Sequence, residues 1–115
     1  MNKNPINLAV YKELQDTTGL EFACELVDTF LEEAPGMLSA LRCASADSNA
    51  VQFRQAAHSL KSNADIFGAA ELAAQARALE LKGLDPDTVR NETTLVALEA
   101  MYACASTALQ DLRND

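Results

Sequence analysis

Apolar residues recur every three or four positions along almost the whole chain, and this spacing is typical of helices with one buried face. Glycine and proline number only four and three among 115 residues, too few for the many turns of an all-β sandwich. The spacing is interrupted near 16–19, 47–49, 68 and 83–86. It therefore predicts a short helix over about 6–15 followed by four longer ones. Because short connections make neighbouring helices antiparallel, we predict one all-α domain over 1–115, an antiparallel up-down-up-down four-helix bundle with a short extra N-terminal helix.

Local signals at the interruptions predict where the helices begin and end. Thr18 followed by Glu21 has capping-box spacing and should open the second helix. Pro35 lies inside that helix and removes a backbone donor, so we expect a kink or a break there, and the in-phase apolar spacing favours a kink. Lys82-Gly83 should close the fourth helix. Asp85-Pro86 should supply the N-cap and the first residue of the fifth.

The charge of the chain excludes several classes of partner. Seventeen acidic against nine basic residues give a net charge of −8, which argues against nucleic acid and against anionic membranes as partners. The chain has no apolar run of membrane-spanning length, and its polar start at 1–5 does not resemble a signal peptide. The odd number of cysteines, with no CxxC pair, predicts buried, reduced thiols in a cytoplasmic protein. They are Cys24, Cys43 and Cys104.

The single histidine lies on the polar side of its predicted helix, which spans about 49–66. At 100° per residue, the apolar stripe that begins at Phe53 includes Ala57 and Leu60 within about 40°, whereas His58 lies about 140° away. We therefore expect an exposed imidazole. With an unperturbed pKa near 6.5, an exposed imidazole is a competent nucleophile at neutral pH.

The surroundings of His58 are basic although the chain as a whole is acidic. Residues 48–64 contain Arg54 and Lys61 and no acidic residue. Two cations would stabilise an anion that arrives at the ring, above all a phosphoryl group, whose charge is spread over its oxygens. From the residues alone, one alternative stays open: His58 is a surface histidine that has no function. A metal site has too few candidate ligands, and no glycine-rich loop is present to bind a nucleotide.

The segment 56–69, AAHSLKSNADIFGA, resembles the signature of histidine-containing phosphotransfer (HPt) domains. That signature reads roughly A-H-x-L-K-[G/S], followed by a glycine ten residues after the histidine, here Gly68, and by a helix ending in L-E, here Leu79-Glu80. The short first helix, the break before a long helix with the sequence FLEEAP, and the long final helix are also similar to this family. The resemblance covers essentially the whole chain.

The resemblance implies a phosphocarrier without an ATP site, and not an enzyme. Such a domain carries a phosphoryl group between aspartates of receiver domains in a multistep two-component phosphorelay. By this resemblance His58 accepts the group on Nε2, Lys61 offsets its charge, and Glu80 stands at the position of a polar side chain that orients Nδ1. The implied partners are receiver domains of a hybrid sensor kinase and of a response regulator. Mg²⁺ would come from the receiver, the protein would hold no cofactor or metal of its own, and we expect a monomer.

The receiver should dock on the same face of the helix. The small side chains of Ser59 and Ser62 leave room for its approach, although the family often has glycine at Ser62. Ile66 either offers an exposed apolar contact or packs against the first or second helix. Asp65 either weakens the basic patch or holds Lys61 in place. Gly68 either permits close helix approach or simply ends the helix. The full set of predicted docking residues is Arg54, Gln55, Ser59, Ser62, Asp65, Ile66 and Gly68.

Two other classes of function remain open from the sequence. One is a helical adaptor or dimerisation module that has this fold but cannot be phosphorylated, with the apolar stripe of the last helix as its contact. The other is a bundle that binds a metal or acts in redox chemistry through its thiols.

Overall fold

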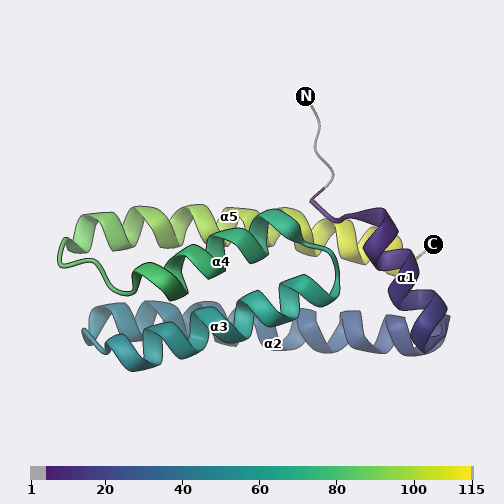
Figure 1. The fold of residues 1–115 in the computed structure, drawn as a ribbon, viewed down its shortest axis with the longest axis horizontal. Coiled ribbons are helices and arrows are strands. Elements are labelled where there is room, and N and C mark those ends of the chain that lie inside the picture. Colours follow the sequence, from purple (N-terminus) through teal and green to yellow (C-terminus); the bar gives the residue numbers. More distant parts are fainter. Residues whose placement is uncertain (1–4, 115) are drawn as a thin grey trace.

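Five helices make up the structure, a computed structural model that describes residues 5–114 (Figure 1). Residues 1–4, on which the signal-peptide argument mainly rests, lie outside the described range. The helices are α1 (Leu8–Thr18), α2 (Leu20–Ala46), α3 (Ala50–Ile66), α4 (Ala70–Lys82) and α5 (Thr88–Arg113). The predicted all-α class is confirmed.

The four longer helices form the bundle, and each runs opposite to the one before it (Figure 1). α2 packs against α3 and α5, and α4 packs against the same two helices. This closed set of neighbours is the predicted up-down-up-down arrangement. The short helix α1 lies across one end of the bundle, beside the first turns of α2 (Figure 1).

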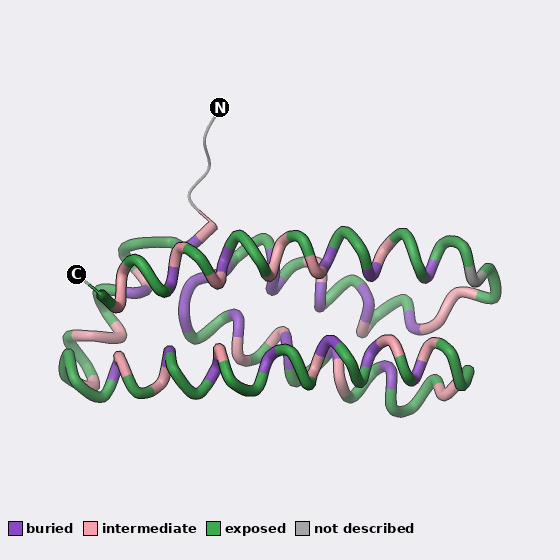
Figure 2. Tube along the Cα trace, turned by 180° about the vertical axis from the view of Figure 1, so that it is seen from behind, coloured by how far each residue is buried: buried purple, intermediate pink, exposed green. Residues whose placement is uncertain are grey.

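The core fills the space between the four long helices, and the buried turns face inward on each of them (Figure 2). It is built from leucine, alanine and a few aromatic rings. The ring of Phe30 on α2 lies 5.2 Å from that of Phe67 and 5.9 Å from that of Tyr102 on α5. Many of the other core side chains are alanine, so α3 and α4 can approach closely, and these two helices make the most extensive contact in the bundle.

Two of the predicted helix starts are wrong. Thr18 is the last residue of α1, and its hydroxyl donates to the Leu14 carbonyl oxygen at 2.7 Å instead of capping α2. α2 follows Gly19 directly and has no side-chain cap. The N-cap of α5 is Asp87 rather than Asp85, because the Asp85 carboxylate accepts from the Asp87 amide at 2.9 Å and forms a turn before the helix begins.

The first helix continues to Thr18, past its predicted end at about residue 15, whereas the signals at 47–49 and 82–83 agree with the structure. α2 continues through Pro35 without a break, and Pro35 is exposed on its solvent side. Asn49 caps α3 by accepting from the Gln52 amide at 3.1 Å. α4 ends at Lys82, and Gly83 follows with φ +73°, a left-handed backbone that favours glycine.

The thiols are free but not buried as expected. Cys43 and Cys104 are exposed, and Cys24 is partly buried. The expected burial of the thiols rested on residue type. In their helices Cys43 and Cys104 instead face solvent, next to the buried Ala44 and Ala105. None of the helices in the described part of the chain is both long and apolar enough to cross a membrane.

Acid is expected to destabilise the bundle by protonating two carboxylates that pair with arginine. A hydrogen bond from Arg113 holds the pKa of Asp28 below its ordinary 3.8, and one from Arg42 holds the pKa of Glu99 below its ordinary 4.5. Because each pKa is lower in the folded state, the stabilisation is complete above the ordinary values and is lost as the pH falls through the lowered ones. Urea unfolding from about pH 7 down to about pH 3 should show this loss. Identical pH dependence in the wild type and Glu99→Gln would contradict the part assigned to Glu99.

Candidate functional site

His58 stands on the solvent side of α3, near its middle. The helix buries the stripe of Phe53, Ala57 and Leu60, and this rotation turns His58 outward, as the angular argument predicted. Its side chain is 58% exposed. The ring is therefore open to a large partner.

The Glu80 side chain of α4 reaches across to the inner nitrogen of the ring. His58 Nδ1 lies 2.6 Å from Glu80 Oε2. A carboxylate can only accept, so Nδ1 carries the proton and donates. In the neutral ring the lone pair is then on Nε2, the nitrogen farther from Glu80. The contact between His58 and Glu80, which are 22 positions apart, is thus present, whereas the sequence could only suggest it.

Lys61 completes a three-residue cluster with these two side chains. It lies one turn after His58 on α3, and its Nζ is 3.6 Å from Glu80 Oε1. Oε2 of Glu80 thus faces His58, and Oε1 faces Lys61. Lys61 and Glu80 are about three-quarters buried, whereas His58 is mostly exposed. Within residues 5–114 no ion pair joins Lys61 to Asp65, so Glu80, and not Asp65, holds the lysine in place.

The end of α4 is fixed against α3 by a second contact. A Cβ added at Gly83 would lie 2.9 Å from Arg54 Nη2, so the guanidinium packs directly over this glycine. A cation at a helix C-terminus is favourable because the last carbonyls make that end negative. Arg54 therefore has a local packing role one turn before His58. Since Glu80 lies in the last turn of α4, this contact also helps to position it.

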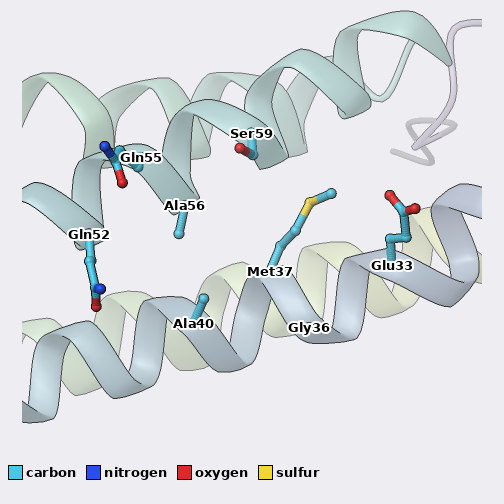
Figure 3. A pocket seen from close by; sticks show the side chains of 8 residues that line it. All are labelled: Glu33, Gly36, Met37, Ala40, Gln52, Gln55, Ala56 and Ser59. Carbon is cyan, nitrogen blue, oxygen red and sulfur yellow. The ribbon is translucent and has the colours of Figure 1, made fainter.

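A shallow groove of ≈520 Å³ borders the site on the side of α2. The small residues Gly36, Ala40 and Ala56 line it together with the Met37 side chain, which extends between the two helices (Figure 3). Ser59, the residue after His58, belongs to its α3 wall. Polar side chains at its edges are Glu33, Gln52 and Gln55.

Most of the predicted docking residues share the outer surface of α3. Exposed residues of this set are Arg54, Gln55, Ser59, Ser62, Asp65 and Ile66. Ile66 is 46% exposed, which favours the apolar-contact alternative. The exception is Gly68, which is buried: its carbonyl accepts from the Asn7 amide at 2.7 Å, and an added Cβ would lie 2.8 Å from that of Val10. Gly68 thus brings α1 close to the bundle and offers no surface to a partner.

Sequence reasoning missed the contribution of α2 and part of that of α4. Met37 and Glu33 border the groove beside Ser59, and Arg77 of α4 lines a second groove together with Lys61. The periodicity of each helix indicated which residues are exposed. It did not indicate which exposed residues of two helices meet, because that depends on the register between the helices.

The side chains around His58 make a poor set of ligands for a metal ion. Among the described residues no group of three or more His, Cys, Asp or Glu side chains is placed to hold a metal ion. The cluster at His58 has one imidazole, one carboxylate and one ammonium group, and the ammonium group is not a ligand.

Comparison with known proteins first defines the class of fold. The structure is similar to the crystal structure of histidine-containing phosphotransfer protein B (HptB) from Pseudomonas aeruginosa PAO1, with a TM-score of 0.83. The match has 23% sequence identity and covers 98% of this chain and 97% of that one. The two chains therefore share the same helical-bundle fold over nearly their whole length.

The sequence then gives the family. The model of the Hpt domain matches residues 25–114, most of the chain. The chain belongs to the Hpt domain family, which confirms the resemblance seen in segment 56–69. No curated protein matches the chain at a significant level.

Proposed function

We propose that this chain is a phosphorelay intermediate that accepts a phosphoryl group on Nε2 of His58 from the aspartate of one receiver domain and passes it to another. The observation that carries the proposal is the pairing of an exposed histidine with Glu80 across the α3–α4 seam. It leaves the nucleophilic nitrogen pointing away from its carboxylate partner, on an open surface. Membership of the Hpt domain family supports the same chemistry.

The transfer is a displacement at phosphorus. The Nε2 lone pair forms the N–P bond as the bond between phosphorus and the aspartyl oxygen of the receiver breaks, and the aspartate leaves as a carboxylate. The ring becomes a phosphorylated imidazolium that keeps its proton on Nδ1, where the negative Glu80 stabilises it. Lys61, which pairs with Glu80, offsets part of the negative charge that the phosphoryl group brings. The same displacement in reverse transfers the group from Nε2 to the aspartate of a second receiver. Mg²⁺ belongs to the receiver in this proposal, and the chain needs no cofactor of its own.

A receiver domain docks over the outer face of α3 and the groove beside α2. Around His58 this surface combines the uncharged Gln55, Ser59, Ser62 and Ile66 with the charged Arg54 and Asp65. The groove supplies an apolar floor of small residues and Met37, into which a partner side chain can pack. We assign the partners as receivers of a hybrid sensor kinase and of a response regulator, acting on a monomer in the cytoplasm.

Phosphotransfer from a panel of labelled phospho-receiver domains tests the function directly. Wild-type protein should take up label within minutes from at least one receiver, and the label should be stable to alkali and lost in acid, as expected for phosphohistidine. A folded protein that takes up no label from any receiver, yet self-associates in sedimentation or binds a partner without phosphate, would support the adaptor alternative instead.

Loss of the Glu80 side chain should slow transfer without ending it. In Glu80→Ala the ring is free to rotate and to place its proton on either nitrogen, so we expect transfer about ten- to a hundredfold slower. Glu80→Gln can still accept from Nδ1 through its amide oxygen and should retain more of the rate. The rate of phosphoryl transfer to both variants is measured by quenching the labelling reaction at a series of times. Equal rates for Glu80→Ala and wild type would remove the orienting role of Glu80.

A further inference from the structure

The cluster at His58 does not have enough positive charge for the group that it is proposed to carry. Lys61 already pairs with Glu80, so the two side chains offset each other. A phosphoryl group on nitrogen adds about two negative charges beside this pair. The imidazolium supplies one positive charge, which faces Glu80 through Nδ1. A further cation near Nε2 would therefore stabilise the phosphorylated state.

Arg77 is placed to supply it. It lies on α4 one turn before Glu80, and with Lys61 and the exposed Leu81 it lines an open groove of ≈420 Å³ between α3 and α4. His58 and Lys61 face Glu80 across the same seam. Ser59, next to His58, lines the groove beside α2, and Lys61, one turn after His58, lines this one.

The rotation of the two helices brings Arg77 and His58 to the same outer edge of the seam. At 100° per residue, Arg77 is about 60° from Glu80 on α4, and His58 is about 60° from Lys61 on α3. Both rotations lead away from the buried stripes, which contain Ala76 and Leu79 on α4. Because the helices are antiparallel and His58 meets Glu80, Arg77 lies opposite the next turn of α3, where Lys61 is.

The charge of Arg77 is not used elsewhere in the described part of the chain. Its side chain is exposed, and within residues 5–114 no ion pair involves it. Arg54, the other arginine near His58, packs instead on Gly83. The one acidic residue that lines the groove with Arg77 is Asp65, which is exposed on α3.

We propose that Arg77 is a phosphoryl-binding residue, whose guanidinium contacts the phosphoryl oxygens on Nε2 of His58 once the group has arrived. The inference rests on the proposed function. Guanidinium groups bind such oxygens with paired N–H donors, and the long arginine side chain spans a helix turn. Arg77 then holds the transferred group in place while Lys61 stays with Glu80.

A charge series at position 77 tests the proposal. The share of label on His58 at equilibrium with a phospho-receiver should fall about two- to fivefold in Arg77→Gln and further in Arg77→Glu, as expected for a cation at an exposed site. Arg77→Lys keeps the charge and should restore most of the wild-type share. The differences should shrink at about 1 M salt, where screening acts over about 3 Å.

Lys12 provides the matched control. It is exposed on α1, which lies at the end of the bundle opposite to the last turns of α4 (Figure 1), so Lys12→Gln and Lys12→Glu change the net charge equally without changing the site. They should leave the equilibrium share of label unchanged. Urea unfolding of the Arg77 variants should match the wild type, which separates binding of the phosphoryl group from a role in stability.

The failures can be told apart. A labelled wild type whose Arg77→Glu variant has the same equilibrium share, or whose Arg77 and Lys12 variants change equally, would overturn this inference and leave the proposed function in place. A wild type that takes up no label would overturn both.

Discussion

His58→Gln should abolish phosphoryl uptake completely. Glutamine has a side chain of similar polarity, but its amide nitrogen has no available lone pair, so no N–P bond can form. His58 is the only histidine in the chain, which means that no second imidazole can take over. Incubation with a labelled phospho-receiver that labels wild type should therefore give only background signal on the variant.

The same variant should fold normally, because the His58 side chain is 58% exposed and its one assigned contact is with Glu80. Substitutions at such positions usually change the free energy of unfolding by less than about 0.5 kcal/mol. Circular dichroism and urea unfolding provide the control. Label retained by a folded His58→Gln protein would assign the phosphoryl group to another residue and contradict the site.

Much of the fold followed from one-dimensional signals. The apolar spacing predicted five helices and the exposed face of α3, because burial repeats along a helix with a fixed period. The helix starts were less predictable. Thr18 and Asp85 both have the residue type of an N-cap, but Thr18 bonds within α1 and Asp85 bonds within a turn. Both alternatives use the same side-chain oxygens, so residue type alone does not decide between them.

The candidate site divides in the same way. His58 and Lys61 lie on one helix, and their relation follows from helical geometry. The pairing of Glu80 with both of them depends on how α4 is set against α3, which the resemblance of the motif suggested and the structure displays. Met37 and Arg77 border the site from neighbouring helices and belong to no local motif. Met37 and Arg77 lie near His58 only because the alanine-rich helices pack in this register.

The chemistry therefore depends on the register of the bundle, and Phe30 is at the centre of that packing. Its ring is 1% exposed and contacts the rings of Phe67, which follows α3, and of Tyr102 on α5. Phe30→Ala removes these contacts and leaves a cavity, which should lower the free energy of unfolding by about 3–5 kcal/mol. That is a large part of the about 5–15 kcal/mol typical of a small domain.

Phe22→Ala on the same helix is the matched control. The Phe22 side chain is 50% exposed, so the same substitution removes little buried surface and should cost about 1 kcal/mol or less. Urea unfolding of the two variants compares them directly. Below its denaturation midpoint, Phe30→Ala should still take up phosphoryl label in proportion to its folded fraction, because Phe30 lies in the core whereas the His58 side chain is exposed. Equal free energies of unfolding for the two variants would contradict the central place of Phe30 in the core. A Phe30→Ala protein that is folded but takes up no label would show that Phe30 also sets the register of α3 and α4, on which the pairing of His58 with Glu80 depends.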